Sequence, residues 1–417
     1  MASTGRLVQL TSLLQEKVKE VDTYIRENNL PDPSFDASYP PVLHLPKQPD
    51  AARQAALEAL DELRAHLLGP VGTIYESVLD HTSPISLHAI TSYDIMNAFP
   101  TNATSTIPEI AEKCGMHPDD ATTMMRHGLA RRLFLQKEDG RIAHSALTRA
   151  IVDVPNFSSF ITGALDDTWV AAPFVVPAMR KWPGSQEPNQ TAFNLAQGTD
   201  LPFFEELGKK AESSGAFADR MSFFMSSPGM SLDYAIEGYT WAAHKGGTIV
   251  DVGGSHGVVA LKLSEKFPGM QITVQDRPEV VARAPKSLTG QVEFQAHDFF
   301  TEQPIKGADV YFFRWIFHDW SDKYCIAILR ALIPALRTGS RVLMMEAIVP
   351  EPGTISGFQE RPLRAFDMGM KELFNSKERS EGEWRKLLGD ADTRFEVVDV
   401  LRPEGSQLGI IVVDWTG

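Results

Sequence analysis

Apolar residues recur at steps of three and four along residues 6–28, which predicts an amphipathic helix. Residues 30–50 are rich in Pro, Asp and Ser and predict an irregular linker. A second helix is predicted from Ala51 to just before Gly69 and Pro70. Because the apolar stripe of the first helix is too long to leave in water, we expect it to help to build a homodimer, with packing inside the chain as the alternative.

Residues 85–150 predict several short helices followed by a hairpin, an order that is typical of a winged helix. Asp139 and Gly140 supply the tight turn that a small wing requires. We therefore expect residues 1–150 to form a mainly helical, winged-helix-like dimerisation domain. Residues 151–245 are expected to form a helical connector and part of a substrate pocket.

A winged helix raises the hypothesis of a DNA-binding regulator that senses a metabolite. In the region that would contact DNA, residues 109–135, four Lys and Arg side chains are matched by four Asp and Glu side chains. Affinity for duplex DNA comes largely from neutralising phosphates, so this balance speaks against nucleic acid as a partner. A structural or dimerising module is the preferred interpretation.

From residue 246 onward, short apolar runs alternate with helical patterns, and each run ends in a Gly or an acidic residue. This pattern predicts an α/β domain over residues 246–417, with a buried parallel sheet and helical crossovers. Ligands of such sheets bind at the carboxyl ends of the strands. The unusual residues of this sequence fall at those ends.

Composition fits a chain of more than one folded domain. Of 417 residues, 43% are hydrophobic and 23% are charged, and the net charge of −14 disfavours polyanionic partners. Two cysteines, Cys114 and Cys325, suggest neither a disulfide framework nor a cysteine metal site, so a reducing, cytoplasmic location is expected. Apolar segments are too interrupted to predict a signal peptide or a membrane span, and no metal-ligand cluster is apparent.

A glycine-rich turn follows the first predicted strand of this domain, in Gly253-Gly254-Ser255-His256-Gly257. Glycines there let the backbone bend sharply and approach a ligand at a helix N-terminus. Asp276 closes the second strand, where a carboxylate can accept both hydroxyls of a ribose, and Asp298 closes the third, where one can reach an adenine amine.

The ligand of this edge is expected to lack phosphates. The loop contains neither the GK[ST] of a Walker motif nor the G-x-G-x-x-G of dinucleotide folds. Acidic strand ends suit an adenosyl ligand with a net positive charge. S-adenosyl-L-methionine matches that description.

The motifs VDVGGSHG, VQDRPEVV, HDFF, FFRWIFHDWSD, EAIVPEPG and SKERSEGEW, in this order, resemble the class I plant-type and fungal O-methyltransferases. The resemblance covers nearly the whole chain and implies a Rossmann-like domain that binds S-adenosylmethionine, preceded by a winged-helix-like dimerisation domain. It also implies methyl transfer to a hydroxyl, expected to be phenolic, of an aromatic or polyketide-like secondary metabolite. Ser255 departs from the family's common third glycine, which puts the local backbone conformation in doubt.

The resemblance also assigns roles to residues. His318 matches the general base, and Glu346 and Glu378 match the two acids that orient it. The residues expected to bind the cofactor are Asp251, Gly253, Gly254, Ser255, Gly257, Asp276, Arg277, Asp298, Phe299 and Arg314.

A histidine is a weak base for removing a proton from a phenol. A phenol with a pKa of about 10 and a histidine near 6.5 differ by roughly 3.5 units, or about 5 kcal/mol. A carboxylate against the other ring nitrogen, a nearby sulfonium and concerted transfer could each help to close this gap.

The acceptor pocket is harder to predict because no motif marks it. Met-rich and aromatic helix faces suit flat acceptors, although core packing explains such faces equally well. The candidates are His144, Met221, Met225, Trp315, Asp319, Phe366, Met370 and Phe374.

One alternative keeps the fold and the cofactor but changes the chemistry. Some relatives of this family catalyse dehydration or pericyclic reactions, and use the bound sulfonium only for its charge. His144 bears on this hypothesis because a histidine in the corresponding segment contributes to catalysis in a pericyclase relative. Its structural interpretation is a polar anchor at the end of the wing.

Overall fold

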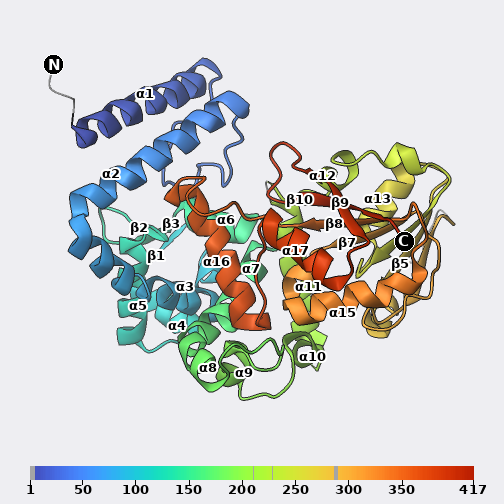
Figure 1. Cartoon of the computed structure of the whole chain (residues 1–417). Helices are drawn as coiled ribbons and strands as arrows, with labels where there is room; N and C mark the ends of the chain where they lie inside the picture. The colour runs from blue at the N-terminus through green and yellow to red at the C-terminus, as the bar shows by residue number, and fades with distance from the viewer. Residues whose placement is uncertain (1–4, 210, 228, 286–289) are drawn as a thin grey trace. The chain divides into compact units, whose positions relative to one another are not determined.

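The alternating pattern of residues 246–417 folds into a seven-stranded mixed sheet (Figure 1). The computed structural model describes residues 5–209, 211–227, 229–285 and 290–417. The strand order is β6-β5-β4-β7-β8-β10-β9; neighbours from β6 to β8 are parallel, and β10 is antiparallel to both β8 and β9. The strands are β4 (Thr248–Val252), β5 (Gln271–Asp276), β6 (Val292–Ala296), β7 (Val310–Arg314), β8 (Arg341–Glu346), β9 (Phe395–Leu401) and β10 (Gly409–Trp415).

Apolar side chains of the central strands point alternately to two faces, and each face has its own core. Val250 and Phe313 pack on one face with α15 (Asp322–Leu332) and α17 (Glu381–Ala391). Ile249 and Phe312 pack on the other face with α12 (Asp233–Glu237) and α13 (Val258–Lys266). Burial on both faces explains why these strands are continuous apolar runs in the sequence, and the predicted α/β fold is confirmed. The predicted parallel sheet is mixed instead, because β9 and β10 are joined by a short connection, which antiparallel neighbours allow and parallel ones do not.

The predicted wing is a three-stranded antiparallel sheet of order β1-β3-β2. Its strands are β1 (Thr104–Ser105), β2 (Phe134–Gln136) and β3 (Ile142–His144). Of the helices α3 (Thr82–Ser92), α4 (Ile107–Cys114) and α5 (Pro118–Ala130), α5 packs against β2, and α3 and α4 pack against α5. Thr106 begins α4 with a capping box to Glu109, and Gly115 ends that helix in the left-handed conformation. The mainly helical, winged-helix-like region is therefore present as predicted.

The two N-terminal helices, α1 (Arg6–Glu27) and α2 (Lys47–Leu79), pack against each other. Leu10 and Ile25 of α1 are buried, so part of its apolar stripe packs within the chain. The helical path of α2 breaks at Gly69, where φ is 68°, and resumes from Pro70 to Leu79. The prediction therefore located the break but missed the helix beyond it.

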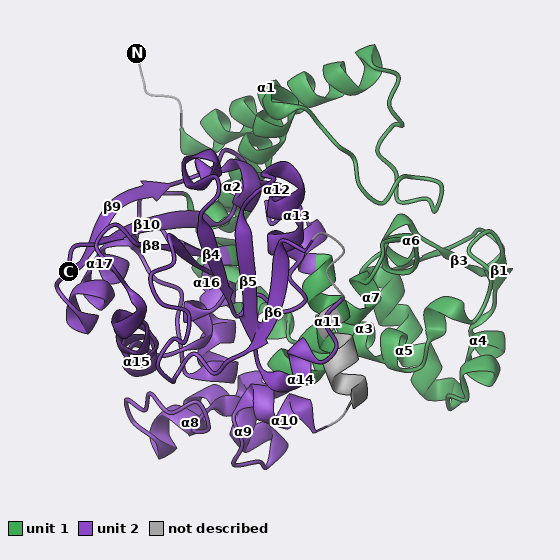
Figure 2. Cartoon of the chain, turned by 90° about the vertical axis from the view of Figure 1, so that its right-hand side faces the viewer, with its two compact units in different colours: residues 1–169, 215–223, 356–362 green, residues 170–214, 224–355, 363–417 purple. Residues whose placement is uncertain are grey.

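The described chain divides into two units (Figure 2). One comprises Met1–Trp169, Gly215–Phe223 and Ser356–Pro362, and the other comprises Val170–Ser214, Phe224–Ile355 and Leu363–Gly417. These differ from the predicted boundaries at 150 and 245. Residues 170–214 belong with the large sheet, partly because Gln186 accepts a hydrogen bond from Ser321 at 2.8 Å and Glu187 pairs with Lys323.

The remaining helices connect these parts. In the first unit they are α6 (Ala146–Asp153) and α7 (Phe157–Gly163). In the second unit they are α8 (Val175–Lys181), α9 (Ala192–Gln197), α10 (Phe203–Gly208) and α14 (Pro278–Val281). Two helices, α11 (Ala211–Ser226) and α16 (Gly357–Phe374), contribute residues to both units.

Candidate active site

The glycine loop follows β4 and is shaped by its contact with the end of β5. Gly253 and Gly257 have positive φ values of 73° and 71°. A Cβ on Gly253 would lie 2.3 Å from a side-chain carbon of Ile316, so the position tolerates no larger residue. Ser255 also adopts a left-handed conformation, with φ at 52°. The serine that replaces the family's third glycine therefore keeps a glycine-like backbone, and it does so at some cost in strain.

Asp276 ties this loop to β5. Its Oδ2 accepts a hydrogen bond from the Ser255 amide at 2.9 Å, and its Oδ1 accepts one from the Arg277 amide at 2.8 Å. Burial raises the pKa of this carboxyl, while both amide bonds oppose the rise. Carboxylate oxygens have two lone pairs each, so capacity remains for a ligand hydroxyl. The Arg277 side chain is exposed and pairs with Glu279.

The buried Asp251 and the half-buried Arg314 are two ionisable side chains beside the loop. Asp251 is buried in β4, and its Oδ2 lacks a hydrogen-bond partner among the described residues. Burial raises the pKa of Asp251 to about 7 and lowers that of Arg314 to about 10. Arg314 donates to the Met230 carbonyl at 3.0 Å and lies over the Trp315 ring, while its Nε is unpaired in the described structure. Unpaired buried polar atoms of both signs are the mark of a ligand site.

The segment after β6 supplies an acid and an aromatic surface. Asp298 is exposed, and its Oδ1 accepts a hydrogen bond from the Phe300 amide at 3.0 Å. Phe299 is half-buried and packs edge-on against Phe300 and Trp320.

His318 lies on a short 3₁₀ turn, Phe317–Asp319, that follows β7. Its Nδ1 lies 3.0 Å from Glu378 Oε1, and its Nε2 lies 3.5 Å from Asp319 Oδ1. Burial lowers the pKa of the imidazole, but the two carboxylates outweigh this effect and raise the pKa to about 10. Burial also raises the pKa of Asp319 to about 6. The site thus strongly favours a proton on His318.

Glu346 ends β8 and is fully buried. Its Oε1 accepts hydrogen bonds from the backbone amides of Ile316 and Phe317, at 3.0 and 2.8 Å. Burial raises its pKa to about 7. Glu346 was expected to orient the imidazole directly, but its hydrogen bonds go instead to the backbone that precedes His318. Of the two predicted orienting acids, only Glu378 makes a hydrogen bond to the ring.

Several acceptor-pocket candidates form an aromatic group in the second unit. The rings of Trp315 and Phe366 lie 6.3 and 5.8 Å from that of Phe224, a further pocket candidate from the same sequence segment as Met221 and Met225. Trp315 has a positive φ of 54°, an uncommon conformation for a large side chain that is held here at the end of β7. Phe366 is exposed, so this aromatic group keeps a surface that an acceptor could cover.

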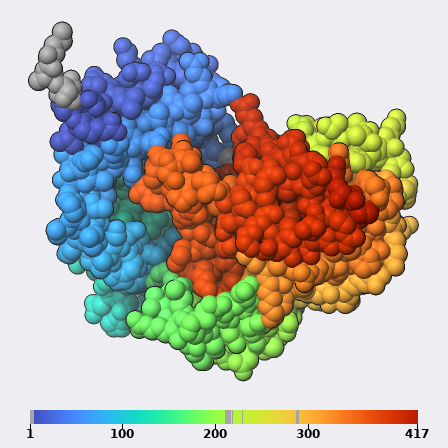
Figure 3. Space-filling model, viewed as in Figure 1, coloured from blue at the N-terminus to red at the C-terminus, as the bar shows by residue number. Residues whose placement is uncertain are grey.

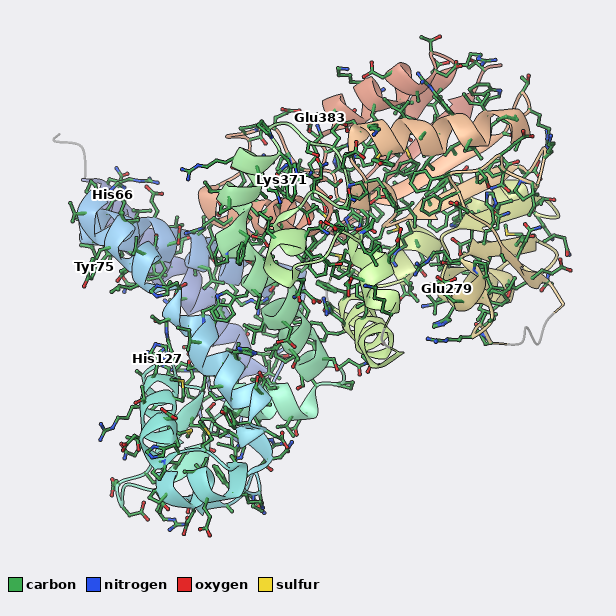
Figure 4. All side chains as sticks on the ribbon, turned by 90° about the horizontal axis from the view of Figure 1, so that it is seen from below. His66, Tyr75, His127, Glu279, Lys371 and Glu383 are labelled. Carbon is green, nitrogen blue, oxygen red and sulfur yellow. The ribbon has the colours of Figure 1, made fainter. Side chains whose placement is uncertain are left out.

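The remaining candidates differ in their surroundings. Phe374 is buried against Phe203 and Phe204, which is core packing. Met370 is half-buried on α16, the helix that also carries Lys371, labelled in Figure 4. Met221 and Met225 are half-buried and lie one turn apart on α11.

His144 is at the end of β3, in the core of the first unit, and is only 1% exposed. Its Nδ1 lies 3.1 Å from the Thr148 hydroxyl and its Nε2 lies 3.2 Å from the Phe99 carbonyl. Burial lowers its pKa, which favours the neutral ring. With both nitrogens occupied, this geometry favours the structural interpretation of His144 over a role in substrate binding.

The strand order, the glycine loop and the acidic strand ends together define a class I methyltransferase domain. A family model described as "O-methyltransferase domain" matches residues 183–394. The chain is 36% identical to the O-methyltransferase PaMT of Phomopsis amygdali, over 99% of this chain and 97% of that protein. It is 33% identical to the chlorophenol O-methyltransferase of Trichoderma longibrachiatum, over 99% and 91%. The chain belongs to the O-methyltransferase family, and it is an S-adenosylmethionine-dependent enzyme.

Solved structures share the fold across the chain. The crystal structure of OxaC aligns with a TM-score of 0.78 at 22% identity, covering 98% of this chain and all of that chain. A structure described as "A Pericyclic Reaction enzyme" aligns with a TM-score of 0.72 at 22% identity, covering 96% and all of that chain. Both likenesses concern the fold alone.

The residues at the glycine loop fit S-adenosylmethionine. In the described structure, one carboxylate oxygen of Asp251 and one side-chain nitrogen of Arg314 have no hydrogen-bond partner. The loop also contains residues with positive φ, a conformation that residues with a side chain rarely adopt. Asp276 and Asp298 end adjacent strands at the same edge of the sheet, with Phe299 beside them. These residues would hold the cofactor by its hydroxyls and its base. No helix among the described residues is long and apolar enough to cross a membrane.

Proposed function

We propose that His318 is the general base that activates a phenolic hydroxyl of an aromatic small molecule for methylation. The observation that carries this proposal is the position of the imidazole between Glu378, at 3.0 Å from Nδ1, and Asp319, at 3.5 Å from Nε2. Glu378 accepts the proton of Nδ1, so that Nε2 is the atom left to receive a proton from the acceptor. Aromatic secondary metabolites, including polyketide-like ones, are the expected acceptors.

The raised pKa of His318 bears directly on this chemistry. A free histidine with a pKa of about 6.5 cannot readily take a proton from a phenol of about 10. With a pKa of about 10, His318 holds a proton as firmly as the phenol does. From a neutral His318, proton transfer from the acceptor oxygen to Nε2 therefore costs little free energy. At neutral pH the ring first has to lose the proton that its two carboxylates favour. When bound, S-adenosylmethionine supplies the transferable methyl group and a positive sulfonium charge.

The shape of the acceptor follows from the aromatic group formed by Phe224, Trp315 and Phe366. Such rings recognise flat apolar molecules by offset stacking and edge contacts. A relative 33% identical to this chain is named a chlorophenol O-methyltransferase, which supports a phenolic acceptor. The predicted pocket residues Met225 and Met370 would adapt to the acceptor's outline.

The direct test compares His318→Ala with His244→Ala. His244 is a matched control because it is a partly buried histidine of the same unit, and it is bonded to the Tyr239 hydroxyl rather than to a carboxylate. The assay uses a chlorophenol and a panel of hydroxynaphthalenes, and it measures S-adenosylhomocysteine and product mass. We expect His318→Ala to lose a factor of about 10² to 10⁴ in kcat, the range for a general base. Cofactor affinity should stay near the wild-type value.

Two results would overturn the proposal. Equal losses of kcat and of cofactor affinity in His318→Ala would place the histidine in cofactor binding instead. A new product of unchanged mass, formed without S-adenosylhomocysteine, would mean that the enzyme uses only the charge of the cofactor, as a cyclase would. A product heavier by one methylene with equal S-adenosylhomocysteine supports methyl transfer.

We further propose that the N-terminal region forms a homodimer. Beyond Gly69, α2 carries Val71, Ile74, Tyr75 and Val78 on successive turns, all more than 60% exposed. Tyr75 is labelled in Figure 4, and the N-terminal helices are blue at the visible surface in Figure 3. An apolar stripe of this length is rare on a monomer, and a second copy of the chain would cover it symmetrically. Leu7 and Val18 of α1 are exposed apolar residues as well.

Light scattering at micromolar concentration tests this assembly. Wild-type protein should have twice the mass of the chain, and Ile74→Glu should lower the mass toward that of one chain. Val398→Glu is the control, since Val398 is an exposed apolar residue on β9. A monomeric wild-type protein would overturn the proposal. Both cysteines are unpaired, which agrees with a reducing, cytoplasmic location, and we propose that location as well.

A further inference from the structure

Arg379 follows Glu378 directly and is fully buried. Its Nη1 donates to the Phe317 carbonyl at 3.1 Å, and its Nη2 donates to the Trp320 carbonyl at 2.8 Å. These two carbonyls flank His318 and Asp319 on either side. One guanidinium group thus spans the two-residue segment that carries the proposed base.

The guanidinium is itself fixed by its neighbours. Asp322 Oδ1 accepts from Arg379 Nε at 2.9 Å, and the Trp384 ring lies 5.2 Å from its central carbon. Two other side chains reach the same carbonyls. The single S–H of Cys325 lies within reach of both, with Sγ at 3.3 and 3.2 Å, and Ser376 Oγ donates to that of Trp320 at 2.7 Å. The carbonyl side of the segment therefore has several donors with defined positions.

The amide side of the same segment is held by a different residue. Glu346 accepts hydrogen bonds from the amides of Ile316 and Phe317. The backbone around His318 is consequently held by a buried anion at its amides and by a buried cation at its carbonyls. Only an arginine can serve the second purpose, because its planar fork reaches two carbonyls at once, whereas a lysine is a single point charge.

We infer that Arg379 is a positioning residue for the methyl-transfer reaction, which holds His318 in register with Glu378 by binding the carbonyls of Phe317 and Trp320. This inference rests on the proposed function of His318. Burying a guanidinium without using its charge would be costly, and an apolar side chain would fill the same space. A base must be held to within a fraction of an ångström, and a shift of about 1 Å can cost about 100-fold in rate.

The test compares Arg379→Lys with Arg330→Lys in the full-length enzyme. Arg330 is the matched control because it too donates to two backbone carbonyls, those of Ala391 and Asp390, both at 3.1 Å, but far along the chain from the turn of His318. We expect Arg379→Lys to lower kcat by about 10- to 100-fold and to shift the pH profile of kcat, with little change in the KM for S-adenosylmethionine. Arg330→Lys should change only the melting temperature.

A second, milder variant keeps the inference testable if Arg379→Lys does not fold. Ser376→Ala removes a single donor to the Trp320 carbonyl, and it should lower kcat by a few-fold in the same direction. An Arg379→Lys enzyme that melts earlier but keeps the wild-type kcat and pH profile would show that Arg379 is merely structural. So would a Ser376→Ala enzyme with wild-type kinetics.

The double variant separates this inference from the proposed function. If Arg379 acts through His318, Arg379→Lys should have almost no further effect on kcat in the His318→Ala background. Full additivity of the two losses would overturn the positioning role while leaving the base in place. A wild-type rate in His318→Ala alone would overturn the proposed base instead.

Discussion

The protein contains two histidines with candidate roles, the buried His144 and the half-buried His318, and the groups around them differ in charge. His144 is enclosed in the core of the first unit and bonded to a hydroxyl and a carbonyl, and burial lowers its pKa. His318 is flanked by two carboxylates, which overcome burial and raise its pKa to about 10. A neutral ring suits the first position, and a ring that gains a proton suits the second.

This difference teaches that burial alone does not indicate catalysis. The two rings differ in the charge of the groups that they contact. They also differ in whether the polar atoms around them have hydrogen-bond partners. Around His318, Glu346 and Glu378 each keep a carboxylate oxygen without a partner in the described structure, whereas both nitrogens of His144 have one. Polar groups that folding leaves unpaired belong to a site that is completed by its ligands.

Replacing Glu378 by Gln should give the largest effect that separates the two histidines. The change keeps the size of the side chain but removes the negative charge next to Nδ1, so the imidazolium form of His318 is less stable and its pKa falls. We expect the limiting kcat at high pH, where His318 is neutral in both enzymes, to drop by about 100-fold, equivalent to about 3 kcal/mol, because a weaker base leaves more of the barrier in place. Steady-state rates of S-adenosylhomocysteine formation between pH 6 and 10 measure it.

The sign of the pH effect can be derived from the same shift. At low pH both His318 and the phenol carry a proton, and methyl transfer requires that the pair has lost one of these two protons. The rate therefore rises with pH until the pH passes the lower of the two pKa values. In Glu378→Gln this rise should end at a lower pH than in the wild type. A rise that moves to higher pH, or a kcat within two-fold of the wild type, would contradict the role of Glu378.

His144→Ala should give the next largest effect, and on stability rather than on rate. The change leaves a cavity between Phe99 and Phe134 and removes two internal hydrogen bonds. We expect the free energy of unfolding to fall by about 2 kcal/mol and kcat of the folded enzyme to stay unchanged. Thermal melts followed by kinetics at a temperature well below the transition measure both quantities. A large loss of kcat without a loss of stability would return His144 to the acceptor site.

Much of this contrast was visible in the sequence, and the reason is local. The glycine loop and the acidic strand ends follow from the residues themselves, whereas the role of Glu378 beside His318, 60 residues away along the chain, follows only from the resemblance to one family. The motifs also placed Asp276 at the strand end where it bonds the Ser255 amide. Residues that act through motif-encoded turns can be predicted because the turn itself determines where the side chain lies.

The parts that were missed depend on contacts between distant segments. The resemblance predicts that Glu346 orients His318, but its partners are backbone amides, which every residue carries and no pattern marks. Arg379 lies in a polar run that reads as solvated, yet it is fully buried. Its adjacency to Glu378 was the one signal available. The continuation of α2 beyond Gly69 was missed because Gly-Pro normally ends a helix.

Of the three substitutions, Asp319→Asn should have the smallest effect. It tests which of the two carboxylates near His318 matters more to that histidine. Asp319 lies 3.5 Å from Nε2, beyond a normal hydrogen bond, so its influence on His318 is mainly that of a nearby charge. Removing the charge should lower the pKa of His318, as in Glu378→Gln, and reduce kcat by about ten-fold, or about 1.4 kcal/mol. The pH at which the rate stops rising should shift downward in both variants, and by less in Asp319→Asn.

Asp399→Asn is the control, because Asp399 is an exposed carboxylate on β9. Asp322→Asn would be a weaker control, because Asp322 bonds Arg379. If Asp319→Asn lowered kcat more than Glu378→Gln does, Asp319 would be in contact with the acceptor, and the carboxylate that matters most to His318 would be the one on its own turn.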